Sequence, residues 1–223
     1  MTKLSWTGFS KKTPQERKEH LKTNALLSQE NQDLLDMDQQ LTLETANQMA
    51  ENVIGRFTLP FAICPDVLVD GVTYQVPMVT EEPSVVAAAS YASKLIKRSG
   101  GFTTTIHDRQ MIGQVALFDV PDKADASSKI QAASQDLIEI AKEAHPSIVK
   151  RGGGPRKLWT ETKGEFLIVY LAVDTQEAMG ANMVNTMMEA LVPELENLSK
   201  GQSLMAILSN LATESLVTAT CRL

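Results

Sequence analysis

The spacing of apolar and polar residues divides the first third of the chain into short helices and a hairpin. Residues 13–16, Thr-Pro-Gln-Glu, have the form of a capping box with proline at the first helical position, which predicts a helix there. Ser28 and Thr42 are predicted to cap two further helices, the second ending at Gly55. Two β-prone runs then flank Asp70-Gly71, a dipeptide that supplies the positive φ angles of a tight hairpin.

Residues 79–90 differ from an ordinary surface segment, because Glu81 and Glu82 precede a run of small, mostly apolar residues. Pro83 suits the first turn of a helix, so Glu82 should lie at or just outside the helix start. The helix has Val, Ala, Ser or Tyr on every face and is expected to be packed on all sides. Glu82 would then point into a cleft, where desolvation raises a carboxyl pKa and the positive helix end lowers it. This makes Glu82 a candidate proton donor; the alternative is that both acids face solvent.

From about residue 111 a second unit is predicted, in the order strand, helix, strand, strand, helix, strand. The segments are residues 111–118, 126–144, 158–162, 166–173, 178–198 and 204–208. This β-α-β-β-α-β order is that of a ferredoxin-like unit, so the fold class is α+β. We expect domain boundaries that give residues 1–108, 109–209 and 210–223, with the last segment returning to the first domain.

Two stretches of the second unit could hold a ligand. In residues 150–157 three glycines let backbone amides approach an anion, and four flanking cations could neutralise it. The alternative is a mobile connection with solvated lysines, since no Walker sequence follows. In residues 173–182 a strand leads into a helix start with small residues, where free N–H groups attract phosphate. Met179, Met183 and Met187 recur at a spacing of four, which favours a core stripe.

Composition narrows the class of protein further. The 223 residues carry a net charge of -6, which argues against a nucleic-acid partner. Two distant cysteines match no metal or disulfide spacing, and three isolated histidines form no zinc or triad pattern, so we expect no metal and a reducing cytoplasm. No apolar run approaches 18 residues, so no membrane segment or signal peptide is expected.

Four motifs now stand in a recognisable order and spacing. They are Glu-Asn-Val-Ile-Gly at 51–55, Glu-Glu-Pro-Ser-Val-Val-Ala-Ala-Ala-Ser at 81–90, Glu-Ala-Met-Gly-Ala-Asn at 177–182 and Ile-Leu-Ser-Asn at 207–210. Over essentially its whole length the chain resembles class II 3-hydroxy-3-methylglutaryl-CoA (HMG-CoA) reductase, the soluble bacterial type. One departure is Glu177, where the family usually has aspartate.

The resemblance implies a large α/β substrate-binding domain, present here only in its N-terminal part, with an inserted small dinucleotide-binding domain. It implies reduction of the thioester by two hydrides from a nicotinamide cofactor, giving mevalonate and CoA, and a homodimer that uses the motif at 51–55. It places the catalytic acid at Glu82, an amide beside it at Asn210, and binding of the hydroxymethylglutaryl part at Ser84. Cofactor contacts would come from Ala178, Met179, Gly180, Ala181 and Asn182.

The resemblance also bears on the choice of cofactor. NAD-preferring relatives carry an acid shortly before the triple glycine, where it would repel a 2′-phosphate. His145 takes that position here, with Lys150 and Arg151 nearby. We therefore expect NADPH to be used at least as well as NADH.

In the family, a lysine, an aspartate and a histidine from further along the chain complete the same site, and residues 1–223 contain none of those segments. The polypeptide of these residues alone is therefore expected to be inactive, because the developing oxyanion would lose its strongest electrostatic partner. Two alternatives stay open. One is a fragment that binds nucleotide or CoA without chemistry, and the other is a structural partner whose sheet edge and apolar face pair with another chain.

Overall fold

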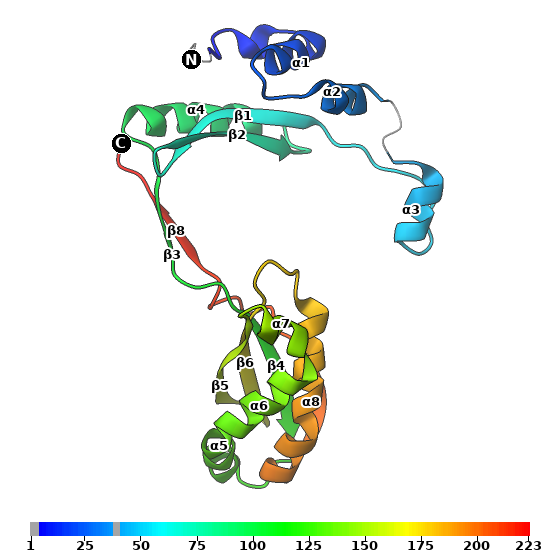
Figure 1. Ribbon diagram of the computed structural model, residues 1–223, viewed down its shortest axis with the longest axis vertical. Coiled ribbons are helices and arrows are strands. Elements are labelled where there is room, and N and C mark those ends of the chain that lie inside the picture. The colour runs from blue at the N-terminus through cyan, green and yellow to red at the C-terminus, as the bar shows by residue number, and fades with distance from the viewer. Residues whose placement is uncertain (1–4, 38–40) are drawn as a thin grey trace. The chain divides into compact units, whose positions relative to one another are not determined.

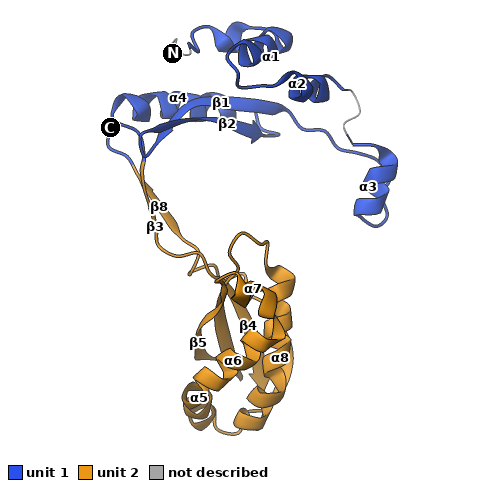
Figure 2. Cartoon of the chain, viewed as in Figure 1, with its two compact units in different colours: residues 1–102, 221–223 blue, residues 103–220 orange. Residues whose placement is uncertain are grey.

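The chain forms two compact units. The computed structural model describes residues 5–37 and 41–223. Unit 1 comprises residues 1–102 and 221–223, and unit 2 comprises residues 103–220 (Figures 1 and 2). These bounds differ from those expected at 108 and 209, because β3 (Thr103–Ile106) and β8 (Val217–Thr220) pair with each other and belong to unit 2. The domain roles expected from the sequence stay predictions.

Unit 1 begins with short, well-capped helices. They are η1 (Phe9–Lys11), α1 (Pro14–Thr23), α2 (Gln29–Asp36) and α3 (Leu43–Met49). The predicted capping box is confirmed, since the Glu16 backbone N–H donates to Thr13 Oγ1 at 3.3 Å and Glu16 Oε2 accepts from the Thr13 N–H at 2.7 Å. The caps by Ser28 and Thr42 are confirmed too. The third helix ends at Met49 and not at Gly55, because Ala50 is already extended.

A hairpin and one helix complete unit 1. β1 (Phe61–Val69) and β2 (Val72–Val79) are antiparallel and joined by Asp70 and Gly71 at φ 48° and 80°, as the sequence predicts. α4 (Val85–Arg98) packs on β1.

The structure corrects two expectations about α4. Pro83 lies outside the helix. The N-cap of α4 is Ser84, which adopts the left-handed conformation at φ 71°. The helix is also not packed on all sides: Ser93 is its one buried residue among those the structure describes, and Tyr91 is 66% exposed. The small residues Ala87, Ala88 and Ala92 of this helix are exposed too.

Unit 2 contains an antiparallel sheet of four strands in the order β5-β6-β4-β7. The first three of these are labelled in Figure 1. The strands are β4 (Met111–Phe118), β5 (Gly154–Lys163), β6 (Phe166–Asp174) and β7 (Gln202–Leu208). The helices are α5 (Lys123–Ala132), α6 (Ser134–Ala144), α7 (Pro146–Lys150) and α8 (Ala181–Ser199). The helix expected at 126–144 is therefore two helices that meet at Ala133, and α7 was not anticipated.

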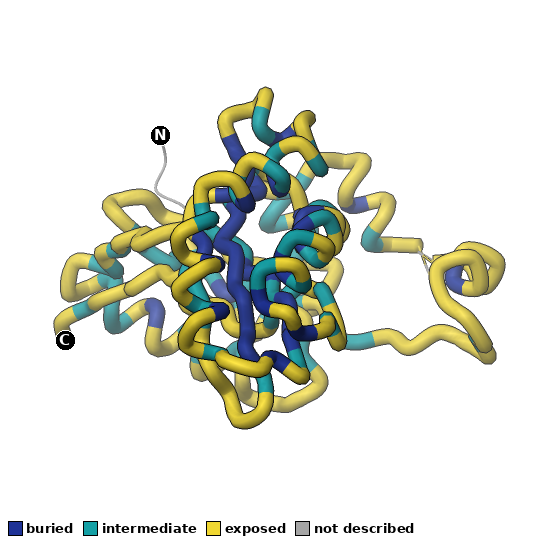
Figure 3. The backbone as a smooth tube through the Cα atoms, turned by 90° about the horizontal axis from the view of Figure 1, so that it is seen from below, coloured by how far each residue is buried: buried dark blue, intermediate teal, exposed yellow. Residues whose placement is uncertain are grey.

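The core of unit 2 lies between the helices and one face of this sheet, and most buried residues of the described chain belong to it (Figure 3). Leu117, Leu171 and Leu191 are fully buried there. Met187 is buried and Met183 packs against the core as expected, whereas Met179 is 75% exposed because it precedes the helix. Within the described residues, no helix combines the length and the apolar character that crossing a membrane requires.

Candidate functional site

The two ligand-binding stretches expected in unit 2 meet at one end of its sheet. β5 begins at Gly154, which pairs with Asp174 at the end of β6. A Cβ atom on Gly153 would lie 2.6 Å from the Asp174 carbonyl oxygen and 2.9 Å from Ile148 Cγ1. Such contacts leave no room for a side chain, so glycine allows the two backbone segments to approach each other.

An ion pair ties the same two segments together. Arg156 Nη2 donates to the Gly152 carbonyl oxygen at 2.5 Å and to Asp174 Oδ2 at 2.9 Å. The Asp174 carboxylate also accepts from the backbone N–H and side-chain amide of Gln176, at 2.9 and 2.8 Å. Partial burial by itself would raise the pKa of Asp174, but the hydrogen bonds from Arg156 and Gln176 outweigh it and lower that pKa below its ordinary value. The Nη2 of Arg156, one of the four cations of residues 150–157, is thus already engaged within the protein.

The turn before α8 is fixed by close packing. Gly180 is the N-cap at φ 82°, and a Cβ atom there would lie 2.5 Å from Thr175 Cγ2 and 2.9 Å from Met111 Sδ. The expected helix start at residue 178 is therefore wrong: α8 begins at Ala181, and Ala178 and Met179 lie in the preceding turn. No side chain caps this helix, so the amides of its first turn are open to an anionic ligand.

The short helix α7 links three of the expected cofactor residues. His145 is its N-cap, with Nδ1 3.2 Å from Ser147 Oγ, and Lys150 and Arg151 stand at its other end, beside the first glycine. Among the ion pairs of the described residues, neither Lys150 nor Arg151 takes part in one. The signal for α7 was Pro146 at the first helical position, which sequence reasoning overlooked.

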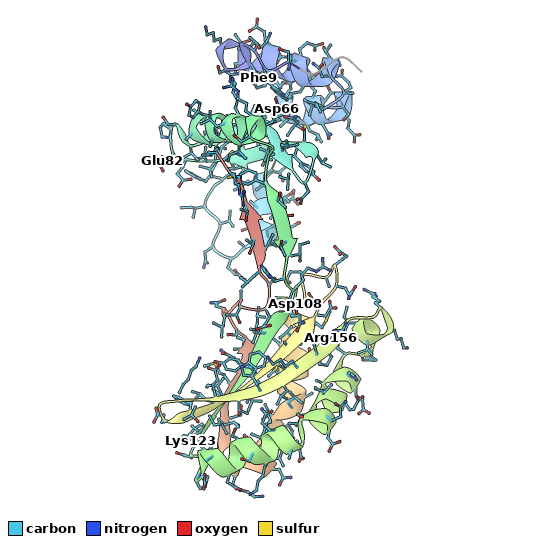
Figure 4. The ribbon with its side chains drawn as sticks, turned by 90° about the vertical axis from the view of Figure 1, so that its left-hand side faces the viewer. Phe9, Asp66, Glu82, Asp108, Lys123 and Arg156 are labelled. Atoms are coloured by element: carbon cyan, nitrogen blue, oxygen red, sulfur yellow. The ribbon has the colours of Figure 1, made fainter. Side chains whose placement is uncertain are left out.

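The expected catalytic residues fall in different units. Glu82, which is labelled in Figure 4, belongs to unit 1 and is exposed. Ser84 belongs to unit 1 and is exposed too. The Glu82 backbone N–H donates to Thr80 Oγ1 at 3.1 Å. Asn210 is exposed just after β7 in unit 2. Desolvation of Glu82 is thus not seen within unit 1, and the assembly of these residues into one site stays a prediction. In the described chain, no cluster of three His, Cys, Asp or Glu residues could hold a metal ion.

Comparison with known proteins decides the family. The family model described as hydroxymethylglutaryl-coenzyme A reductase matches residues 13–223. The chain belongs to this family.

Individual relatives agree with this assignment. The 3-hydroxy-3-methylglutaryl-coenzyme A reductase of Archaeoglobus fulgidus is 40% identical over 216 residues, which cover 95% of this chain and 49% of that protein. The class II reductase of Streptococcus pneumoniae, whose structure was solved bound to NADPH in open conformations, is 63% identical with a TM-score of 0.92, over 97% of this chain and 60% of that one. A second structure of the pneumococcal enzyme gives a TM-score of 0.93, and the match covers 97% of this chain and 52% of that one. The resemblance to class II reductases is confirmed, and the chain spans about half the length of these relatives.

Proposed function

We propose that this chain supplies the catalytic acid and the dinucleotide-binding unit of an HMG-CoA reductase, which reduces the thioester to mevalonate with NADPH and releases CoA. The proposal rests on family membership and on one structural observation. The glycine turn at 152–154 and the uncapped start of α8 meet at the same end of the unit 2 sheet, beside Lys150 and Arg151, which form no ion pair within the part of the chain that the structure describes. The pneumococcal relative solved with NADPH supports this choice of cofactor.

Unit 2 would be the ferredoxin-like domain that is inserted into the larger substrate-binding domain. Its element order is strand, helices, strand, strand, helix, strand. Its antiparallel strand order β5-β6-β4-β7 supports this assignment.

Specific groups of unit 2 suit the parts of a dinucleotide. Backbone amides at Ala181 and Asn182 can bind the pyrophosphate, and the small residues Ala178 and Gly180 let a flat ring come close. Lys150 and Arg151 can bind a 2′-phosphate, and His145 brings no negative charge against it. NADPH would supply the hydride when bound. NADH remains usable in this proposal, but a preference for NADH of about tenfold or more in kcat/KM would contradict it.

In unit 1, Glu82 would protonate the oxygen of the substrate carbonyl, and Ser84 would hydrogen-bond the hydroxymethylglutaryl part. Asn210 would stand beside the acid in the assembled site. Glu82 is exposed in unit 1, so further protein would have to cover it to exclude water from the site. We also propose a cytoplasmic homodimer that uses the motif at 51–55. Ile54, at 101% exposure, and Phe57, at 87%, support an interface there, since such side chains rarely gather in water.

A chimera tests the catalytic part of the proposal. Residues 1–223 would replace the matching segment of the pneumococcal enzyme, and NADPH oxidation would be followed with HMG-CoA. We expect turnover in the chimera and a loss of about 100-fold or more in kcat with Glu82→Gln, since general acids contribute roughly that factor. Glu81→Gln is the matched control and should change kcat by no more than about twofold. A folded chimera without turnover, or one in which Glu82→Gln is as active as Glu81→Gln, would refute the proposal.

Nucleotide binding without chemistry is the second candidate for the chain by itself. This candidate is favoured because the glycine turn and the start of α8 both belong to unit 2, which has a hydrophobic core of its own. Titration of the 223-residue chain with NADPH, followed by nucleotide fluorescence, tests it. Saturable binding of NADPH, with no NADPH oxidation after HMG-CoA is added, would support this candidate. Oxidation of NADPH coupled to conversion of the added HMG-CoA to mevalonate and CoA would support the reductase itself.

A further inference from the structure

We propose that Arg156 is a positioning residue for the dinucleotide: paired with Asp174, it holds the triple-glycine turn against the turn that precedes α8. The inference rests on the proposed function, because it assumes that the dinucleotide binds at these two turns. Arg156 lies near the start of β5 (Figure 4). Its Nη2 donates both to the Gly152 carbonyl oxygen and to the Asp174 carboxylate, at 2.5 and 2.9 Å, and so joins the two segments.

The segments that this pair joins have unusual backbones. Gly152 and Gly154 have φ angles of 87° and 103°, and Gln176 has a φ of 52°, which a residue with a side chain seldom adopts. The Asp174 carboxylate accepts from the Gln176 N–H and so supports this left-handed conformation. One carboxylate therefore holds the turn before α8, while its partner Arg156 holds the glycine turn.

Close packing couples the backbone position of Asp174 to that of the first residues of α8. Thr175, the next residue, is 6% exposed and lies against Gly180, the N-cap of α8. In the glycine turn, a Cβ atom on Gly153 would clash with the Asp174 carbonyl oxygen, so these two backbone segments are in direct contact. A shift of Asp174 would therefore move both the glycine turn and the amides at the start of α8, since well-packed segments transmit strain.

Removing the charge of Asp174 distinguishes a positioning role from a purely electrostatic one, because the two predict opposite changes in NADPH affinity. A carboxylate beside a phosphate site repels the ligand, so electrostatics alone predicts that Asp174→Asn binds the polyanionic NADPH more tightly. Positioning predicts the opposite sign, because the variant loses the link to Arg156. The side chains of Arg156 and Asp174 are 42% and 22% exposed, so their loss should leave the core of unit 2 intact.

The first experiment measures the Kd for NADPH of the 223-residue chain by nucleotide fluorescence. We expect Asp174→Asn and Arg156→Ala each to weaken binding about tenfold, and the double variant to be no weaker than either, as coupled residues behave. Lys129→Ala removes the exposed Asp125–Lys129 pair on α5 and is the matched control, with an unchanged Kd. Tighter binding by Asp174→Asn, or additive losses in the double variant, would overturn the proposal.

A second measurement does not depend on binding. In the ligand-free chain, we expect amide hydrogen exchange at 152–154 and 175–180 to be faster in both variants, and exchange at the β5–β6 turn, 163–165, to stay the same. Unchanged exchange at both turns would overturn the positioning role, whereas a wild-type chain that binds no NADPH would overturn the proposed function instead. Should Arg156→Ala fail to fold, Arg156→Met keeps most of the apolar stem but removes the charge and the donors, and it should still weaken binding and quicken exchange.

Discussion

At the scale of single residues, Ser84 stands out because a serine holds the left-handed conformation directly before α4, at φ 71°. This region costs a residue with a Cβ atom about 1–2 kcal/mol, and glycine avoids that cost. We therefore expect Ser84→Gly to be more stable than Ser84→Ala by up to about 1 kcal/mol in urea unfolding. Both variants should lose substrate affinity in the chimera if the hydroxyl binds substrate. Equal stability of the two variants would show that the backbone there is not strained.

Asp174 gives a prediction about pH. Its folded-state pKa is lowered, so its contribution to stability is fully present above the ordinary aspartate pKa and is lost as the pH falls through the lowered value. We expect the free energy of unfolding to decrease below about pH 4 in the wild-type chain, and less steeply in Asp174→Asn. Urea titrations between about pH 3 and 6 would measure this. The same slope in both proteins would mean that the carboxylate is unpaired in solution.

At the scale of elements, the contact between β4 and α8 depends on Gly113. A Cβ atom there would lie 2.4 Å from Met188 Cγ and 2.8 Å from Val184 Cγ1, both on α8. Gly113→Ala should therefore destabilise unit 2 by about 1–3 kcal/mol, as overpacking does. Gly55→Ala, where nothing lies within 4 Å, is the control and should leave unfolding of unit 2 unchanged. A Gly113→Ala variant of wild-type stability would mean that the two elements can separate without cost.

The same elements show what the sequence could predict. The Asp70-Gly71 hairpin and the four strands of the β5-β6-β4-β7 sheet follow from local turn chemistry and from apolar runs, and the structure contains them. The break at Ala133 carries no local signal, because alanine is the best helix former. The late start of α8 depends on contacts of Gly180 with Thr175 and Met111. Those contacts form only when β4 and β6 are in register, so they cannot be read from local sequence.

The sequence predicted the two turns of the candidate site but not the ion pair that joins them. The two turns could be located because glycines and small residues mark close backbone approach, and both turns lie at one end of the same sheet. The pairing of Arg156 with Asp174 could not be predicted, because the pairing register of β5 and β6 shifts at an irregularity between Pro155 and Lys157. A simple count outward from the turn at Gly164 therefore does not bring these two residues together.

At the scale of the whole molecule, the two units differ in how much core they possess. Large apolar side chains are exposed throughout unit 1, among them Met49 at 72%, Phe61 at 60% and Tyr91 at 66%. The chain spans about half the length of its curated relatives, and unit 1 by itself does not enclose a core comparable to that of unit 2. The pattern of α4 predicted a helix packed on every face, and this prediction is wrong for unit 1, which leaves much of the helix exposed.

This difference predicts unequal stability within one chain. Local opening costs least where few apolar contacts hold an element, so amides of α4 should exchange faster than those of α8, which carries five fully buried side chains: Val184, Met187, Met188, Leu191 and Leu195. Hydrogen exchange followed by mass spectrometry would measure both helices in one sample. Leu191→Ala should lower the protection of α8 by about 2–5 kcal/mol while leaving α4 unchanged, because the cavity forms in the core of unit 2 alone. Equal protection of α4 and α8 in the wild-type chain, or loss of protection in both helices with Leu191→Ala, would show instead that the units unfold as one.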